Sequence, residues 1–181
     1  MNLYYTNVAY ADQAQNRPDL SLGGFRSSSK VPSADYNNLF GDVSAYSIQT
    51  NKEEYICIML KNETGVIATA VKLWVSLPTE TSFKIEVGAT TPTITGEVER
   101  IQTPYQRPMY ATFVSVEGEV NAASLGNIAI NGMIALWFKK IVNISALQEQ
   151  ETDTSLANYF AANSENRKPS VQDIDIVLSW T

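Results

Sequence analysis

Hydrophobic and polar residues alternate with a period of two from about residue 46 to residue 181. The alternation is clearest over residues 55–60, 71–77, 83–87, 134–139 and 174–180. Successive side chains of a strand point to opposite faces, so this pattern predicts strands with one face on a core. Weaker strands are expected near residues 96–101 and 110–116. The predicted inward set is Ile56, Ile58, Leu73, Val75, Ile85, Leu136, Ile174 and Ile176.

Turn residues separate these segments. Residues 62–65 (NETG) predict a turn between two strands, and Asn131-Gly132 precedes the strand that begins near Met133. About seven short strands at this spacing predict an all-β fold, an antiparallel β-sandwich of Ig-like or jelly-roll-like type, over residues 46–181. Residues 145–168 lack alternation and predict either a short helix around 155–162 or a long loop between the last two strands.

The first 45 residues are polar and show no steady period, so we interpret them as an extended N-terminal arm. Their aromatic content is too high for a solvated linker, which suggests that the arm lies on a surface. Two alternatives stay open: the arm wraps its own domain, or it lies on a neighbouring subunit. The residues expected to form this interface are Tyr4, Tyr5, Tyr10, Leu22, Phe25, Tyr36, Leu39 and Phe40. Gly23-Gly24 is interpreted as a flexible bend.

Two predicted strands carry apolar residues on both faces, because Trp74 and Trp137 lie opposite their aliphatic neighbours. Either these strands are covered on both sides, or one face meets a partner. Lys139-Lys140 at the end of one strand is interpreted as an exposed, solubilising pair.

Composition removes most enzyme chemistry. The chain has no histidine and one cysteine, Cys57, which excludes His-dependent triads, His-ligated metals and an internal disulfide. The acidic residues Asp173 and Asp175, and those at 149, 151 and 153, are interpreted as solvated. A net charge of −6 argues against nucleic acid as a partner. We expect no enzymatic activity, cofactor, metal, small-molecule substrate, targeting segment or membrane span.

Four stretches together resemble small virion structural proteins of tailed bacteriophages. They are residues 18–25 (PDLSLGGF), 37–40 (NNLF), 54–62 (EYICIMLKN) and 71–75 (VKLWV), with residues 135–140 (ALWFKK) similar to a penultimate strand of that group. The resemblance covers residues 15–75 best. It implies a sandwich with an arm and carries no catalytic residue to transfer.

The resemblance implies a structural component of the virion at the capsid surface, neck or tail, made in the host cytoplasm. Its expected partners are other virion proteins and copies of itself, as a homo-oligomer. An alternative is a carbohydrate- or receptor-binding β-sandwich module, in which Trp and Tyr side chains stack on sugars.

Overall fold

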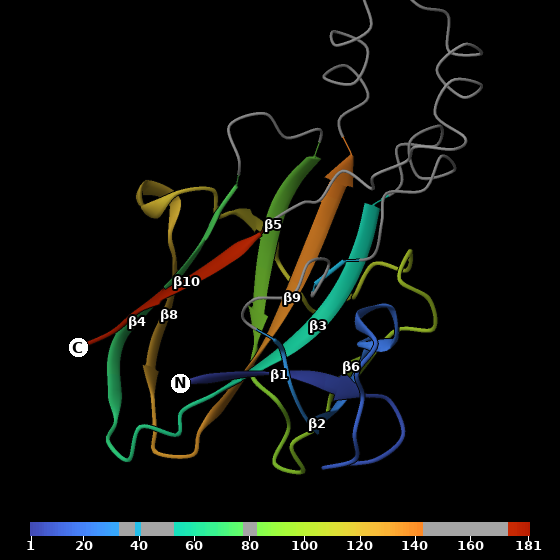
Figure 1. Cartoon of the computed structure of the whole chain (residues 1–181), viewed down its shortest axis with the longest axis horizontal. Helices are drawn as coiled ribbons and strands as arrows, with labels where there is room; N and C mark the ends of the chain where they lie inside the picture. The colour runs from blue at the N-terminus through green and yellow to red at the C-terminus, as the bar shows by residue number, and fades with distance from the viewer. Residues whose placement is uncertain (33–38, 41–52, 78–82, 143–173) are drawn as a thin grey trace, which may run out of the picture.

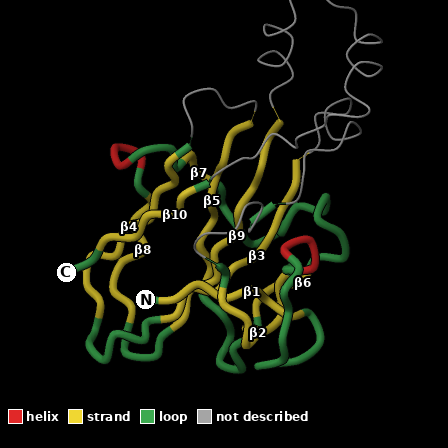
Figure 2. The backbone as a smooth tube through the Cα atoms, viewed as in Figure 1, coloured by secondary structure: helices red, strands yellow, loops and turns green. Residues whose placement is uncertain are grey.

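The computed structural model describes residues 1–32, 39–40, 53–77, 83–142 and 174–181. This part of the chain is built from antiparallel strands and two 3-10 turns, Pro18–Leu20 and Glu119–Asn121 (Figure 2). The strands are β1 (Asn2–Asn7), β2 (Gly23–Lys30), β3 (Glu53–Lys61), β4 (Ala68–Ser76), β5 (Phe83–Thr90), β6 (Val98–Arg100), β7 (Val114–Ser115), β8 (Ala123–Ile128), β9 (Met133–Val142) and β10 (Asp175–Ser179). The prediction of an all-β, sandwich-like fold is confirmed.

The strands form two sheets. The larger has the order β6-β2-β1-β3-β9-β5-β7, and the smaller has the order β10-β4-β8 (Figure 1). Three long strands, β3, β9 and β5, form the centre of the larger sheet, and β3 runs in unbroken register with β9 from Glu53 opposite Ile141 to Lys61 opposite Met133. This long unbulged ladder fixes which side chains share a face.

The main core lies between the two sheets. Ile56 and Ile58 from β3, and Ile85 from β5, meet Leu73 and Val75 from β4 there. Of the eight residues predicted to point inward, seven are buried and Ile176 is half-buried against the same core. The period-two pattern identified this core correctly, because the strands of each sheet present one apolar face to the other sheet.

A second core covers the opposite face of the larger sheet. It contains Tyr55, Cys57 and Met59 from β3 and Ala135 and Trp137 from β9. The covering residues are Leu22, Val98, Ile101, Ala111 and half-buried Phe113. Trp137 is therefore a core residue, whereas Trp74 is half-buried on the outer face of the smaller sheet, opposite Val177.

The expectation of a separate N-terminal arm, with a boundary at residue 45, is wrong for residues 2–30. β1 pairs with both β2 and β3, so it is an internal strand of the larger sheet. The sequence concealed this because β1, β2 and the residues just before β2 carry polar side chains inside the fold: Thr6, Ser21 and Ser27 are fully buried.

Those buried hydroxyls replace apolar contacts with hydrogen bonds. Ser21 Oγ donates to the carbonyl of Cys57 at 2.5 Å, and the backbone N–H of Thr6 donates to Ser21 Oγ at 2.8 Å. The N–H of Gly23 donates to Thr6 Oγ1 at 3.0 Å. Buried polar groups are tolerated when they are paired in this way, and a search for alternating apolar residues does not find strands stabilised by them.

Gly23 and Gly24 are closely packed rather than flexible. Both have positive φ, and a Cβ on Gly23 would lie 1.9 Å from the carbonyl oxygen of Glu99 in β6. A Cβ on Gly24 would lie 2.5 Å from the carbonyl oxygen of Asn7 in β1. The pair is therefore required where β2 passes between its two neighbouring strands.

The two weaker predicted strands exist but are short, since β6 has three residues and β7 has two. The turns at residues 62–65 and at Asn131-Gly132 lie where they were predicted, with Asn131 at φ 57°. β8 was missed because its apolar residues do not alternate steadily. The prediction for residues 145–168 lies outside the described residues. Among the residues that the structure describes, no helix is long and apolar enough to cross a membrane.

Candidate functional site

The structure buries most of the residues predicted to form an intersubunit interface. Tyr4, Tyr5, Leu22, Leu39 and Phe40 are each less than 8% exposed, within the chain's own cores. The prediction that these five side chains are available to a partner is therefore wrong for the folded chain. Residues 2–30 pack on the chain's own domain, which is the first of the two alternatives for the arm.

The other three predicted interface residues have different outcomes. Phe25 is half-buried, with the Arg100 guanidinium 5.3 Å from its ring centroid. Tyr10 is 61% exposed, so it remains available at the surface. Tyr36 lies outside the described residues.

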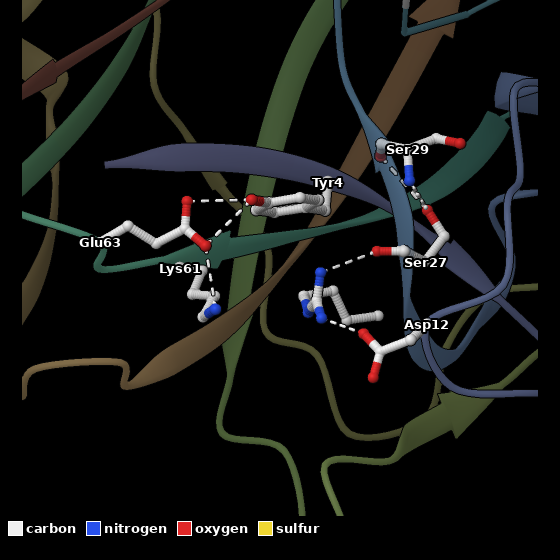
Figure 3. A network of polar contacts seen from close by, with 7 residues as sticks. Tyr4, Asp12, Ser27, Ser29, Lys61 and Glu63 are labelled. Carbon is white, nitrogen blue, oxygen red and sulfur yellow. Dashed lines mark hydrogen bonds and ion pairs between the residues drawn. The ribbon is translucent and has the colours of Figure 1, made fainter.

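Polar contacts tie β1 to the turn after β3 (Figure 3). The Tyr4 hydroxyl donates to Glu63 at 2.9 Å, and Lys61 pairs with the same carboxylate at 2.9 Å. The Asn2 side-chain amide also donates to Glu63 at 2.5 Å. Hydrogen bonds from Lys61 and Asn2 lower the pKa of Glu63 to about 2, and burial together with the Glu63 contact raises the pKa of Tyr4. This network holds β1 against the turn that follows β3.

A row of charges crosses the central strands on the face of the second core. Lys139 of β9 lies between Glu53 of β3, at 2.7 Å, and Glu86 of β5, at 3.2 Å. Burial alone would raise the pKa of Glu53, but hydrogen bonds from Lys139 and Tyr55 outweigh it and lower that pKa. Burial opposes the charge on Lys139, yet its two carboxylate partners raise its pKa. The two ion pairs of Lys139 thus join β9 to β3 and to β5.

Lys140 points to the opposite face and is fully buried. It pairs with Glu54 at 2.6 Å, and its Nζ lies 5.0 Å from the centroid of the Phe40 ring. The interpretation of Lys139-Lys140 as an exposed pair is therefore wrong, because alternation places one lysine in each core and both form ion pairs there. Removing either partner of such a pair leaves an uncompensated buried charge.

Two further sequence features have structural roles. Cys57 is completely buried, and burial raises its thiol pKa, so the reactive thiolate is suppressed. Asn62 is also buried, and its side-chain amide donates to the carbonyls of Val66, Ile128 and Ala129 at 2.7–3.2 Å. Asn62 thereby joins the turn after β3 to the turn before β9, which explains an asparagine in this position.

Acidic groups form no metal centre in the part of the chain that the structure describes. Asp175 is exposed at the start of β10. Asp173 and the acidic residues at 149, 151 and 153 lie outside the described residues.

The surface feature that sequence reasoning missed is the covering loop, residues 101–113, between β6 and β7. Its inner side closes the second core with Ile101 and Ala111, and Pro108 is buried as well. Its outer side presents Tyr105, Met109 and Tyr110, which are 41%, 78% and 76% exposed. Three large, partly apolar side chains within six residues are unusual for a loop in contact only with water, although single exposed apolar residues are common.

The covering loop is held firmly to the sheet. The Glu99 carboxylate accepts the backbone N–H groups of Met109 at 2.6 Å and Tyr110 at 3.0 Å. The N–H of Tyr55 in β3 donates to the carbonyl of Pro104 at 2.6 Å, and the N–H of Ile101 donates to the carbonyl of Leu22 at 3.0 Å. The loop backbone is thus fixed at both ends, and the exposed side chains are presented without a large ordering cost on binding.

Aromatic contacts add to this frame. The rings of Phe113 and Tyr55 lie 5.4 Å apart between centroids, and the Arg107 guanidinium lies 5.7 Å from the Phe113 centroid. The sequence signal that could have identified the loop is TPYQRPMY, in which Pro104 and Pro108 accompany Tyr and Met at short spacing. The sequence predicts a weak strand from about residue 110, whereas the strand in the structure, β7, begins at Val114.

Comparison with known proteins gives no match: no family model, no curated protein and no solved structure is significantly similar to this chain.

Proposed function

We propose that this chain is a structural subunit of a tailed-bacteriophage virion and that it contacts neighbouring virion proteins through the covering loop. The observation that carries the proposal is the exposure of Tyr105, Met109 and Tyr110 on a backbone held by Glu99. Tyr and Met are enriched in the buried centre of protein interfaces, and a rigid anchor binds at low entropic cost.

The motifs that carry the resemblance to phage virion proteins have structural roles in this fold, as the proposal expects. Ser21 and Gly23-Gly24 join β2 to its neighbours, and Leu39 and Phe40 fill the main core. Asn62 joins two turns. These motifs therefore specify how the sandwich is assembled, and the interaction surface that we propose is the covering loop.

The proposal is tested in the phage whose genome encodes this chain. A null mutant is complemented with tagged protein, particles are purified on a density gradient, and the tag is detected in the particle fraction. Wild-type protein is expected in the particles, whereas the double variant Met109→Ser, Tyr110→Ser is expected to be depleted at least tenfold. The matched control is Val120→Ser, because Val120 is 97% exposed on the turn at Glu119–Asn121. Absence of the wild-type chain from particles, or equal incorporation of both variants, would contradict the proposal.

A second candidate function is glycan binding, and one observation favours it. The covering loop exposes two tyrosine rings, Tyr105 and Tyr110, and tyrosine faces stack on sugar rings. A glycan array distinguishes the two functions. Binding that is lost in Tyr105→Ala and Tyr110→Ala, together with normal incorporation of both variants, would favour the glycan-binding module.

A further inference from the structure

The strands at the sheet edges differ in how well they are protected against pairing with another chain. The larger sheet ends in β6 and β7, which have only three and two residues. In the smaller sheet, β8 meets β4 through two register shifts, next to Ala70 at φ 50° and Gly126 at φ 72°. Short strands and bulges are the usual protection of exposed edges.

β10 has no such protection. It pairs with β4 in continuous register from Asp175 opposite Ser76 to Ser179 opposite Lys72. It contains no proline and no lysine, and its middle residues Ile176, Val177 and Leu178 are half-buried. Among the described residues, no strand pairs with its other side (Figure 1). A regular apolar edge of this kind favours the addition of a further strand.

The backbone groups that β10 offers at this edge follow from its pairing with β4. Thr181 exchanges two backbone hydrogen bonds with Thr69, at 2.9 and 3.1 Å. Backbone groups of alternate residues point the same way along a strand, so Ser179 and Val177 also bond toward β4. The N–H and C=O groups of Ile176 and Leu178 consequently point to the open edge.

We infer that β10 pairs antiparallel with β10 of a second copy of this chain, about a twofold axis at Val177. In this register Ile176 lies opposite the partner's Leu178 and exchanges both backbone hydrogen bonds with it, and the symmetric pair doubles the number to four. Val177 lies opposite the partner's Val177, and the two smaller sheets become one continuous sheet.

A second copy fits this edge because the outward backbone groups of Ile176 and Leu178 meet their own counterparts in the twofold register. Charge favours this register over one centred on Asp175. Asp175 is the one charged residue of β10, and the twofold axis at Val177 places it opposite Ser179, so the two carboxylates lie at opposite ends of the paired strands. An axis at Asp175 would instead place both carboxylates directly opposite each other, which destabilises a strand pair. The inference deepens the proposed function, because it rests on a subunit that assembles with copies of itself, but it uses a surface separate from the covering loop.

Val177 provides a direct test, because in the proposed dimer it lies opposite Val177 of the second copy. Full-length wild-type chain should sediment and scatter light as a dimer of about twice the 20.0 kDa chain mass. Val177→Lys and Val177→Glu should each weaken dimerisation at least tenfold, since each places two like charges directly opposite. An equimolar mixture of the two variants should restore a heterodimer, detected by native mass spectrometry. The matched control is Ser124→Glu, which adds the same charge as Val177→Glu to the exposed edge strand β8, opposite Lys72, and should leave the dimer intact.

Circular dichroism and a melting curve show whether each variant folds, and restoration by mixing works only with folded chains. A wild-type chain that is monomeric at every concentration in the micromolar range would overturn the inference. So would equal weakening by Val177→Glu and Ser124→Glu, or failure of the folded mixture to associate. A dimer that passes these tests but is absent from virions would refute the proposed function alone, and a monomeric chain found in virions would refute this inference alone.

Discussion

Replacing Gly23 by alanine should destabilise the fold far more than the same change at Gly65. Both glycines have positive φ, +88° and +81°, so both substitutions impose the strain of a left-handed alanine, about 1–2 kcal/mol. A Cβ at Gly65 would meet nothing within 4 Å, whereas at Gly23 it would lie 1.9 Å from the Glu99 carbonyl oxygen. The comparison therefore isolates the steric effect of close backbone packing.

The extra cost at Gly23 follows from the movement that the clash forces. Real Cβ atoms essentially never lie within 3.0 Å of such an atom, so β2 and β6 must separate by more than 1 Å. A separation of that size breaks the pairing of Gly23 with Arg100 and strains the adjacent bond from Ile101 N–H to the Leu22 carbonyl. Two backbone hydrogen bonds at about 1 kcal/mol each, added to the strain, give a total near 3–4 kcal/mol.

Urea unfolding, followed by tryptophan fluorescence, measures both free energies of unfolding. We expect a loss of about 3–4 kcal/mol for Gly23→Ala and about 1–2 kcal/mol for Gly65→Ala, with unchanged urea dependence. Equal losses for the two variants would refute the argument that Gly23 is required by the close approach of β6.

Three further predictions concern single side chains. Because the folded pKa of Glu63 is lowered from 4.5 to about 2, its contribution is present above pH 4.5 and is lost as pH falls toward 2. Glu63→Gln should therefore flatten the acid limb of a stability–pH curve by about 1 kcal/mol, a partly exposed group being screened, and an unchanged limb would contradict this. Cys57 should resist a thiol reagent in the folded chain and react in full after unfolding, and rapid labelling of folded protein would disprove its burial. Trp137→Ala should cost about 3–5 kcal/mol by chemical denaturation followed by circular dichroism, whereas a loss below 1 kcal/mol would show that the second core is not packed.

The alternating pattern alone is enough to predict the all-β class and the main core. Alternation at Ile56, Ile58, Leu73, Val75 and Ile85 reports directly on burial, because a strand with one covered face must repeat every two residues. The turns at residues 62–65 and at Asn131-Gly132 were also predictable, since the turn chemistry of asparagine and glycine is local.

The position of residues 1–30 and the exposure of the covering loop depend on contacts between segments that are distant in the sequence. β1 and β2 are stabilised by pairing with β3 and β6 and by buried hydroxyls such as Ser21, and none of these contacts leaves a periodic signal in the local sequence. Likewise, Tyr4 lies between Leu3 and Tyr5, and Tyr110 lies between Met109 and Ala111, yet Tyr4 is buried and Tyr110 is exposed. The difference arises because β1 is an internal strand of the larger sheet, whereas the covering loop closes the second core from outside and turns Tyr110 toward solvent.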